Sequence, residues 1–184
     1  MTKKIILAQT AGFCMGVSLA LRKLDQALEK HQEENIYTLG PIIHNPQVLK
    51  KYASLGVNII EDIDQAQPQD MVIIRAHGIP LETENTLRKR QIQIIDATCP
   101  KVKKAQLLIQ KHSSLSKHLL LYGEPDHPEV RGLVSYAQGK TYVFDSLENS
   151  QKLNLNSNEH YFLAAQTTQD RKQFYAIEQF VQKK

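Results

Sequence analysis

The chain has 184 residues, of which 41 % are hydrophobic and 23 % charged, and its formal net charge is +4. This composition is that of an ordinary globular protein of one large or two small domains, able to bury a core. No apolar run approaches the ~18–20 residues that span a membrane, and the positive charges are scattered, with no arginine stripe and no interleaved aromatic residues. We therefore expect neither a membrane nor a nucleic acid as partner, and the basic balance indicates a solvated surface.

The first apolar stretch of the chain superficially resembles the start of a signal peptide, because two lysines precede three apolar residues in Lys3–Leu7. The stretch is too short for the apolar region of such a peptide and runs straight into polar residues. We therefore predict a first strand at Lys4–Gln9 and a cytoplasmic protein.

Short apolar runs of four to six residues recur along the rest of the chain, which is the length expected of buried parallel strands. In chain order, the predicted strands are Lys4–Gln9, Ile36–Leu39, Val57–Ile60, Met71–Arg75, Ile92–Ile95, His118–Tyr122, Thr141–Phe144 and Tyr161–Ala165.

Helical patterns lie between several of these strands. Apolar residues keep a 3.6-residue period from Val17 to Leu28, and Asn45 followed by Pro46 is a helix cap with proline at the first helical position. Further helices are predicted from Pro100 onward and over Phe174–Val181. Alternating strands and helices imply an α/β protein with mainly parallel sheets.

The two halves of the chain resemble each other. Cys99 follows Cys14 by 85 residues, and each cysteine precedes a predicted helix. The segment at His44 is similar to the segment 83 residues later at His127. The strand that ends before His77 corresponds in the same way to the strand that ends before Thr167. This period is too long for a solenoid repeat and predicts two small α/β lobes, at residues 1–98 and 99–184.

The distinctive polar residues share one location, immediately after a strand. In open α/β sheets the carboxyl ends of the strands form the ligand crevice. If the two lobes face each other, one cavity would collect Cys14, His44, His77, Cys99, His127, Glu129 and Thr167.

The two cysteines invite two interpretations. Taken singly, each is as well explained as a structural core residue. A helix amino terminus, however, favours thiolate over thiol, and thiolates are metal ligands. As a pair at repeat-equivalent positions, Cys14 and Cys99 are better explained as ligands of a soft metal.

Three histidines follow predicted strands and lie within two residues of a Gly or Pro, namely His44, His77 and His127. They differ from the other four, which we interpret as surface residues. One such histidine is usually a packed polar residue, but three at matched positions favour an anionic ligand such as a phosphate. Glu129 is a candidate proton donor if burial raises its pKa, although a carboxylate near a helix start often only compensates the dipole. The hydroxyl of Thr167, like that of Thr168 beside it, suits proton relay or substrate binding.

Several common motifs are absent from the sequence. It has no G-x-G-x-x-G fingerprint, no Walker loop and no C-x-x-C pair. A Rossmann dinucleotide site, thioredoxin chemistry and a zinc ribbon are therefore not supported.

Six segments in order along the whole chain resemble the family of 4-hydroxy-3-methylbut-2-enyl diphosphate reductases. They are Gly12-Phe13-Cys14-Met15-Gly16-Val17, Gly40-Pro41-Ile42-Ile43-His44-Asn45-Pro46-Gln47-Val48, Arg75-Ala76-His77-Gly78-Ile79, Asp96-Ala97-Thr98-Cys99-Pro100, His127-Pro128-Glu129-Val130 and Gln166-Thr167-Thr168. Any one segment is weak evidence, but all six in order are very specific.

The resemblance implies a fold of three α/β lobes around a 4Fe–4S cluster held by one cysteine from each lobe. Cys14 and Cys99 would be two of these ligands, and His44, His77 and His127 would bind the diphosphate substrate. Glu129 would deliver protons and Thr167 would contact the substrate alcohol. The implied reaction is a two-electron reductive dehydroxylation that yields isopentenyl and dimethylallyl diphosphates, with electrons from ferredoxin or flavodoxin.

The sequence departs from the family in one respect, since no cysteine follows Cys99. Projecting the repeat places the next cysteine where this sequence ends, so a whole third lobe is missing. We expect the activity to belong to a longer chain or to need a complementing lobe. The alternatives are a non-catalytic two-lobe remnant that binds a diphosphate, and a plain structural α/β module.

Overall fold

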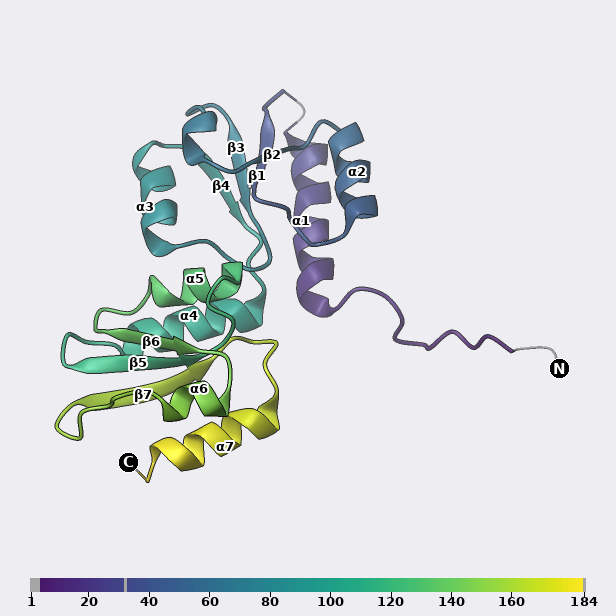
Figure 1. Cartoon of the computed structure of the whole chain (residues 1–184). Coiled ribbons are helices and arrows are strands. Elements are labelled where there is room, and N and C mark those ends of the chain that lie inside the picture. Colours follow the sequence, from purple (N-terminus) through teal and green to yellow (C-terminus); the bar gives the residue numbers. More distant parts are fainter. Residues whose placement is uncertain (1–3, 32, 184) are drawn as a thin grey trace.

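The computed structural model describes residues 4–31 and 33–183. It contains two parallel β-sheets, each covered by helices on both faces (Figure 1). The first sheet has the strand order β2-β1-β3-β4, and the second has the order β6-β5-β7. Every neighbouring pair of strands is parallel. The predicted α/β class with parallel sheets is confirmed.

The strands are β1 (Ile36–Leu39), β2 (Asn58–Ile60), β3 (Met71–Ile74), β4 (Gln93–Asp96), β5 (Lys117–Tyr122), β6 (Thr141–Phe144) and β7 (His160–Ala165). The α-helices are α1 (Met15–Lys30), α2 (Pro46–Ser54), α3 (Leu81–Lys89), α4 (Pro100–His112), α5 (Pro128–Val134), α6 (Leu147–Gln151) and α7 (Arg171–Val181), and a 3₁₀-helix η1 lies at Ile63–Gln65. Seven of the eight predicted strands are confirmed to within one residue at each end.

Burial on both faces explains why these strands are recognisable in the sequence. Helices α1 and α2 pack on one face of the first sheet, and η1 and α3 pack on the other. In the second sheet, α4 and α5 cover one face and α6 and α7 the other. The central strand β3 is buried along its entire length, so both sets of its alternating side chains are apolar.

The second sheet repeats the first in order and direction. The order β6-β5-β7 corresponds to β2-β1-β3, and α4 stands before β5 as α1 stands before β1. Strand β4 leads through a three-residue connection directly into α4, which joins the two sheets. The lobe boundaries at residues 1–98 and 99–184 stay a prediction.

The predicted first strand at Lys4–Gln9 is wrong. This segment is an extended arm that leads away from the first sheet (Figure 1), and Ile5, Ile6 and Leu7 are 94 %, 78 % and 84 % exposed. A β-strand needs a partner for its backbone N–H and C=O groups. The strands at the edges of the first sheet are β2 and β4, so no described strand pairs with the arm.

Across residues 4–31 and 33–183, none of the helices combines the length and apolar character that crossing a bilayer requires.

Candidate functional site

Each cysteine occupies the N-cap position of a helix. Cys14 precedes α1, Cys99 precedes α4, and neither side chain accepts a hydrogen bond from its helix. Both thiols are free of disulfide bonds; Cys14 is exposed and Cys99 is half-buried. Neither sulfur is therefore consumed as a helix cap, and both remain available as ligands.

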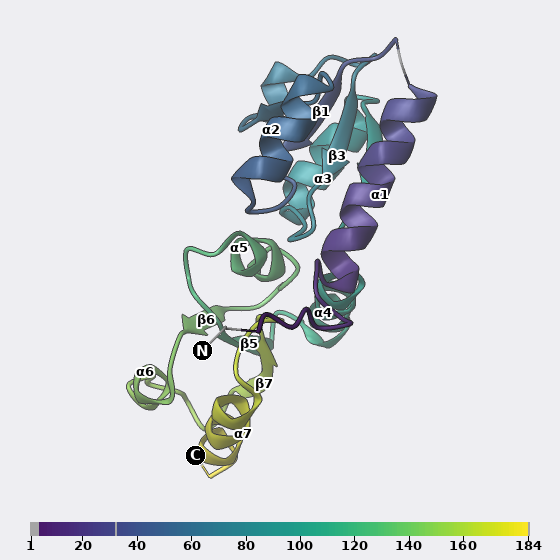
Figure 2. The same cartoon turned by 90° about the vertical axis from the view of Figure 1, so that its right-hand side faces the viewer.

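The first turn of α1 packs directly on Cys99. A Cβ atom placed on Gly16 would lie 2.6 Å from the Cys99 Sγ atom, so only glycine permits this approach. Gly16 is two residues beyond Cys14, and Figure 2 shows the amino end of α1 beside the start of α4. The two cysteine-bearing helix starts thus meet at one place in the fold.

The three selected histidines form a row between the lobes. The ring centroids of His44 and His77 are 5.1 Å apart, and those of His77 and His127 are 5.3 Å apart. His44 precedes the Asn45 cap of α2, His77 follows β3, and His127 is the N-cap of α5. Residues from both lobes are therefore in mutual contact here.

Burial and like charges set the protonation of this row. Burial, followed by the charges of His127, His44 and Arg75, lowers the pKa of His77 from 6.5 to about 4. His77 is thus neutral at pH 7, and its buried Nδ1 atom has no hydrogen-bond partner among the described residues. An unsatisfied polar atom of this kind is costly unless a ligand or water completes it.

Glu129 extends the row on its other side. Its carboxylate is 1 % exposed. It accepts hydrogen bonds from the backbone N–H of Thr167 at 2.6 Å and from the Thr167 Oγ1 at 3.0 Å. Burial raises the pKa of Glu129 above its usual 4.5, although the Thr167 hydrogen bonds and the charge of His127 act in the opposite direction. A buried carboxyl group with a raised pKa is suited to proton transfer.

One hydrogen bond fixes the tautomer of His127. The backbone N–H of Glu129 donates to His127 Nδ1 at 3.1 Å. Because Nδ1 accepts, the proton of the neutral ring resides on Nε2, and that N–H is available to donate to a ligand.

A polar cavity of about 420 Å³ adjoins this row. Arg75, Pro128 and Arg131 contribute to its lining, together with the carboxylates of Glu61 and Asp62. The buried Arg75 Nε atom has no hydrogen-bond partner within the described structure. Burial lowers the pKa of Arg75, while the charge of Glu61 partly offsets this. Arg75 is a feature that the sequence did not single out, although it stands two residues before His77.

The structure thus brings five of the seven selected residues into one contiguous row, in the order His44, His77, His127, Glu129 and Thr167. Cys99 lies against the first turn of α1. Cys14 is exposed at the N-cap of α1 and has no described contact with the row. The functional roles of all seven residues stay predictions.

The surroundings of the two cysteines leave both sulfurs available to a cluster. Both are free thiols at helix amino termini. The Cys99 sulfur lies against Gly16, in space that a Cβ atom on that residue would occupy. These positions fit two corners of an iron–sulfur cluster. The sequence has no third cysteine, and within residues 4–31 and 33–183 no group of three or more His, Cys, Asp or Glu side chains is placed to hold a metal ion.

Comparison with known proteins gives consistent results. The profile of the LytB protein family matches residues 5–184. A 4-hydroxy-3-methylbut-2-enyl diphosphate reductase of Nitratidesulfovibrio vulgaris strain DP4 is 52 % identical over 180 residues, covering 94 % of this chain and 62 % of the relative. The enzyme of that name from Oleidesulfovibrio alaskensis is 52 % identical over 177 residues, covering 96 % of this chain and 63 % of the relative.

Two solved structures also match. The structure of an (E)-4-hydroxy-3-methyl-but-2-enyl diphosphate reductase, described as the terminal enzyme of the non-mevalonate pathway, aligns with a TM-score of 0.82 at 38 % identity, covering 97 % of this chain and 63 % of that one. The reductase structure from Plasmodium falciparum aligns with a TM-score of 0.82 at 30 % identity, covering 95 % and 55 %. The chain therefore spans about three fifths of the length of the curated relatives it matches.

Proposed function

The chain belongs to the LytB protein family, and on this premise we propose that it forms the part of a 4-hydroxy-3-methylbut-2-enyl diphosphate reductase that carries the histidines of the substrate site and two cluster ligands. The overall reaction adds two electrons and two protons to the substrate. One proton leaves with the hydroxyl oxygen as water, and the other ends on carbon, giving isopentenyl or dimethylallyl diphosphate for isoprenoid biosynthesis.

The observation that carries this proposal is the continuous row from His44 to Thr167, together with the packing of the first turn of α1 on Cys99. The proposal draws its candidate anion-binding histidines, its candidate proton donor and its two thiols from six separate segments of the chain. A purely structural module would not need any of them.

The histidines would hold the diphosphate. His127 presents its Nε2–H as a donor because its Nδ1 is occupied by the Glu129 N–H. His77 is neutral at pH 7, so it also offers a ring N–H, and a phosphate oxygen would accept from it. A neutral His77 donates to the charged substrate without placing a further imidazolium charge between its two neighbours.

Glu129 would supply a proton to the reacting end of the substrate, since its raised pKa keeps a larger fraction of the carboxyl protonated. The Thr167 hydroxyl, which donates to Glu129 at 3.0 Å, links the carboxyl group to an exposed position where the substrate alcohol would lie. Exchange of protons between these two groups requires no movement of the backbone.

Cys14 and Cys99 would hold two corners of a 4Fe–4S cluster, which supplies the two electrons of the reaction one at a time when it is bound. Soluble carriers of single electrons, ferredoxin or flavodoxin, are the proposed donors. A cytoplasmic location is part of the proposal, because free thiols of this kind persist in reducing compartments.

The histidine row, whose ring contacts involve neither cysteine, favours a second candidate function, a diphosphate-binding protein without catalysis. In this case the histidine row would bind a diphosphate and no cluster would persist.

The decisive experiment joins this chain to the remaining C-terminal portion of a 52 % identical relative. The fusion is reconstituted with iron and sulfide under anaerobic conditions and assayed with reduced viologen and 4-hydroxy-3-methylbut-2-enyl diphosphate. We expect sustained formation of isoprenoid diphosphates, and loss of this activity in the Cys99→Ala fusion. The matched control is the unfused relative, reconstituted and assayed under the same conditions.

The 184-residue chain alone should bind pyrophosphate but fail to sustain turnover. A fusion that binds four irons and converts no substrate would contradict the reductase proposal and leave the binding function. Sustained turnover by the unfused chain would contradict the need for further ligands.

A further inference from the structure

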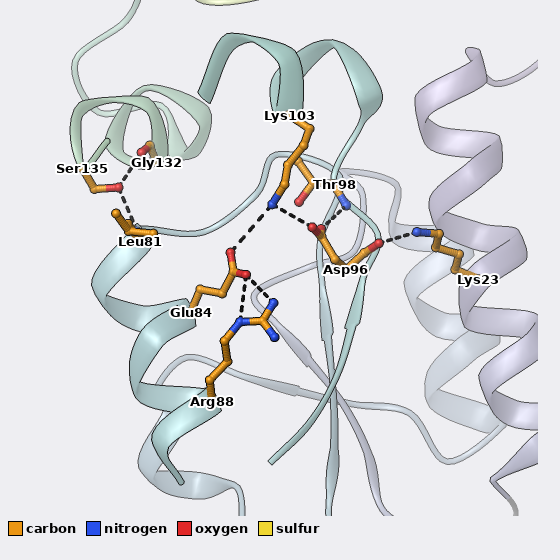
Figure 3. Close-up of polar contacts among 9 residues, drawn as sticks. All are labelled: Lys23, Leu81, Glu84, Arg88, Asp96, Thr98, Lys103, Gly132 and Ser135. Carbon is orange, nitrogen blue, oxygen red and sulfur yellow. Dashed lines mark hydrogen bonds and ion pairs between the residues drawn. The ribbon is translucent and has the colours of Figure 1, made fainter. Parts of the chain in front are cut away.

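Asp96, the last residue of β4, is bound through its carboxylate on both sides of the Cys99 turn. Its Oδ1 accepts a hydrogen bond from the Thr98 N–H at 2.9 Å, and its Oδ2 lies 2.9 Å from the Lys103 Nζ (Figure 3). Thr98 precedes Cys99 and Lys103 lies one turn into α4. The carboxylate therefore spans the segment that carries the cysteine and ties its two ends together.

The backbone of the same residue is held from the other cysteine-bearing helix. The Lys23 Nζ atom on α1 donates to the Asp96 carbonyl oxygen, as Figure 3 shows. Helix α1 begins immediately after Cys14. One residue is thus in contact with both helices whose amino ends carry a thiol.

A wider set of contacts supports this point. Lys103 Nζ is also 3.8 Å from Glu84 Oε2 on α3, and Glu84 Oε1 is paired with Arg88 at 2.6 Å. Nearby, the Leu81 N–H donates to Ser135 Oγ at 2.9 Å, which links α3 to the end of α5. The Lys103 side chain is therefore held between acidic partners on β4 and α3.

The Cys99 main chain and the body of α4 are also held by other contacts. The Cys99 N–H donates to the Ala76 carbonyl and the Lys103 N–H to the Cys99 carbonyl, both at 2.9 Å. Further along α4, Val102 and Ile109 are buried. The Asp96–Lys103 pair adds a side-chain connection that runs from the strand end, across the Cys99 turn, to the first turn of the helix.

From this geometry we propose that Asp96 is a positioning residue that holds the start of α4, and with it the Cys99 sulfur, against the first turn of α1. This role bears on the proposed function only if the two sulfurs are cluster ligands, as proposed above. Loss of the Asp96–Lys103 pair lets the Cys99 turn move away from Gly16. The sulfur then becomes more accessible to solvent and loses its fixed position against the first turn of α1.

The test measures alkylation rates of both thiols in the metal-free, reduced chain by mass spectrometry, with the exposed Cys14 as internal reference. Asp96→Asn removes a negative charge near Cys99, and Lys103→Met removes a positive one. A change in thiolate electrostatics would move the Cys99 rate in opposite directions in the two variants. A change in position raises the Cys99 alkylation rate in both variants. We expect the ratio of the Cys99 rate to the Cys14 rate to increase about fivefold.

Two matched variants control the experiment. Lys103→Arg retains the ion pair and should keep the wild-type ratio of rates. Asp64→Asn breaks a comparable pair, Asp64 to Arg90 at 2.7 Å, that lies away from both cysteines, and should also leave the ratio unchanged. Urea unfolding of each variant establishes that it is folded during alkylation, and Lys103→Met serves alone should Asp96→Asn fail to fold. Unchanged rates, or rates that move in opposite directions, would overturn the positioning role.

Iron uptake separates this inference from the proposed function. The fusion to the C-terminal portion of the relative, with Asp96 and Lys103 unchanged, is the wild type for this measurement. After its anaerobic reconstitution, iron and sulfide per chain are measured by chemical analysis and visible absorbance. Raised Cys99 rates together with no iron in the wild type would support the positioning role and overturn the cluster. Iron in the wild type together with unchanged thiol rates would leave the cluster and overturn the positioning role.

Discussion

His77 and Glu129 are two buried ionisable side chains in one row, and burial moves their pKa values in opposite directions. Burial disfavours the charged form of each group, so the pKa of His77 falls to about 4 and that of Glu129 rises. Both groups are therefore biased toward neutrality near pH 7. His77 thus brings an N–H donor and Glu129 a proton source, and neither adds a charge to the row.

The lowered pKa of His77 predicts a pH dependence of stability. Between about pH 6.5 and 4 the unfolded chain binds a proton at His77 that the folded chain does not, so the free energy of unfolding should fall as the pH falls through this window. His77→Gln abolishes this uptake, and its acid-induced loss of stability should be smaller by about 1–3 kcal/mol. Urea unfolding at about pH 7.5, 5.5 and 4.5 measures this difference.

Glu129 acts with the opposite sign, since its raised pKa favours proton uptake by the folded state. The comparison with His77→Gln removes this contribution, because Glu129 is present in both proteins. His160→Gln, at an exposed position, is the control. Parallel stability curves for the wild type and His77→Gln would mean that His77 titrates normally in the folded chain.

The histidine row also predicts anion binding that does not need a cluster. We expect the chain to bind pyrophosphate, and the double variant His44→Ala, His77→Ala to bind it at least about tenfold more weakly, a loss of about 1.4 kcal/mol. Isothermal calorimetry gives the affinities, and His160→Ala serves as the matched control. Equal affinity in the double variant would remove both histidines from the site.

At the scale of secondary-structure elements, the sequence was most informative where burial is complete. β3 and the Leu119–Leu121 part of β5 are apolar on both faces, and the sequence predicts both strands nearly to the residue. The Asn45 cap of α2 is likewise predicted from its Pro46 neighbour. The arm at residues 4–9 has the same apolar character but no partner, and strand pairing is not visible in a local pattern. Asp96 and Arg75 were missed because their roles arise from contacts with α1, α4 and α5.

The packing of α1 on Cys99 gives a test in which helix propensity and sterics disagree. Propensity alone predicts that Gly16→Ala stabilises α1 by up to about 1 kcal/mol. The added Cβ would approach Cys99 Sγ to 2.6 Å, so we instead expect the free energy of unfolding to fall by about 1–3 kcal/mol.

Gly132→Ala in α5 is the matched control for this substitution. Its Cβ would meet the nearest atom, the Ile79 carbonyl oxygen, at an ordinary 3.6 Å, so helix propensity should prevail and stabilise the protein by about 0.5–1 kcal/mol. Chemical denaturation of both variants decides the matter. Equal stabilisation by the two substitutions would show that α1 and Cys99 are not in contact in solution.

At the scale of the whole molecule, the two lobes are joined by a short connection and by specific side chains. β4 runs into α4 through three residues, His77 packs edge-on against His127, and the Leu81 N–H donates to Ser135. The sequence repeat predicted two similar units and the convergence of their strand ends. It carried no information on the angle between them, because orientation depends on contacts between residues far apart in the sequence.

The exposed N-terminal arm should contribute nothing to this assembly. Deleting residues 4–9 removes side chains that are almost fully exposed, so the free energy of unfolding should change by less than about 0.5 kcal/mol. Thermal and urea unfolding of the shortened chain provide the measurement. A larger loss would mean that the arm docks on the folded lobes in solution.

The same arm has a consequence for how copies of this chain behave at high concentration. The exposed segment Ile5–Leu7 can form intermolecular β-strand pairs with the same segment of another copy. Among the described residues, Lys4 is the single charge that flanks it. We expect light scattering to grow with protein concentration and with added salt, which screens the repulsion between chains of net charge +4. The chain lacking residues 4–9 should remain monodisperse under the same conditions, and Ile6→Lys should reproduce most of that gain in solubility.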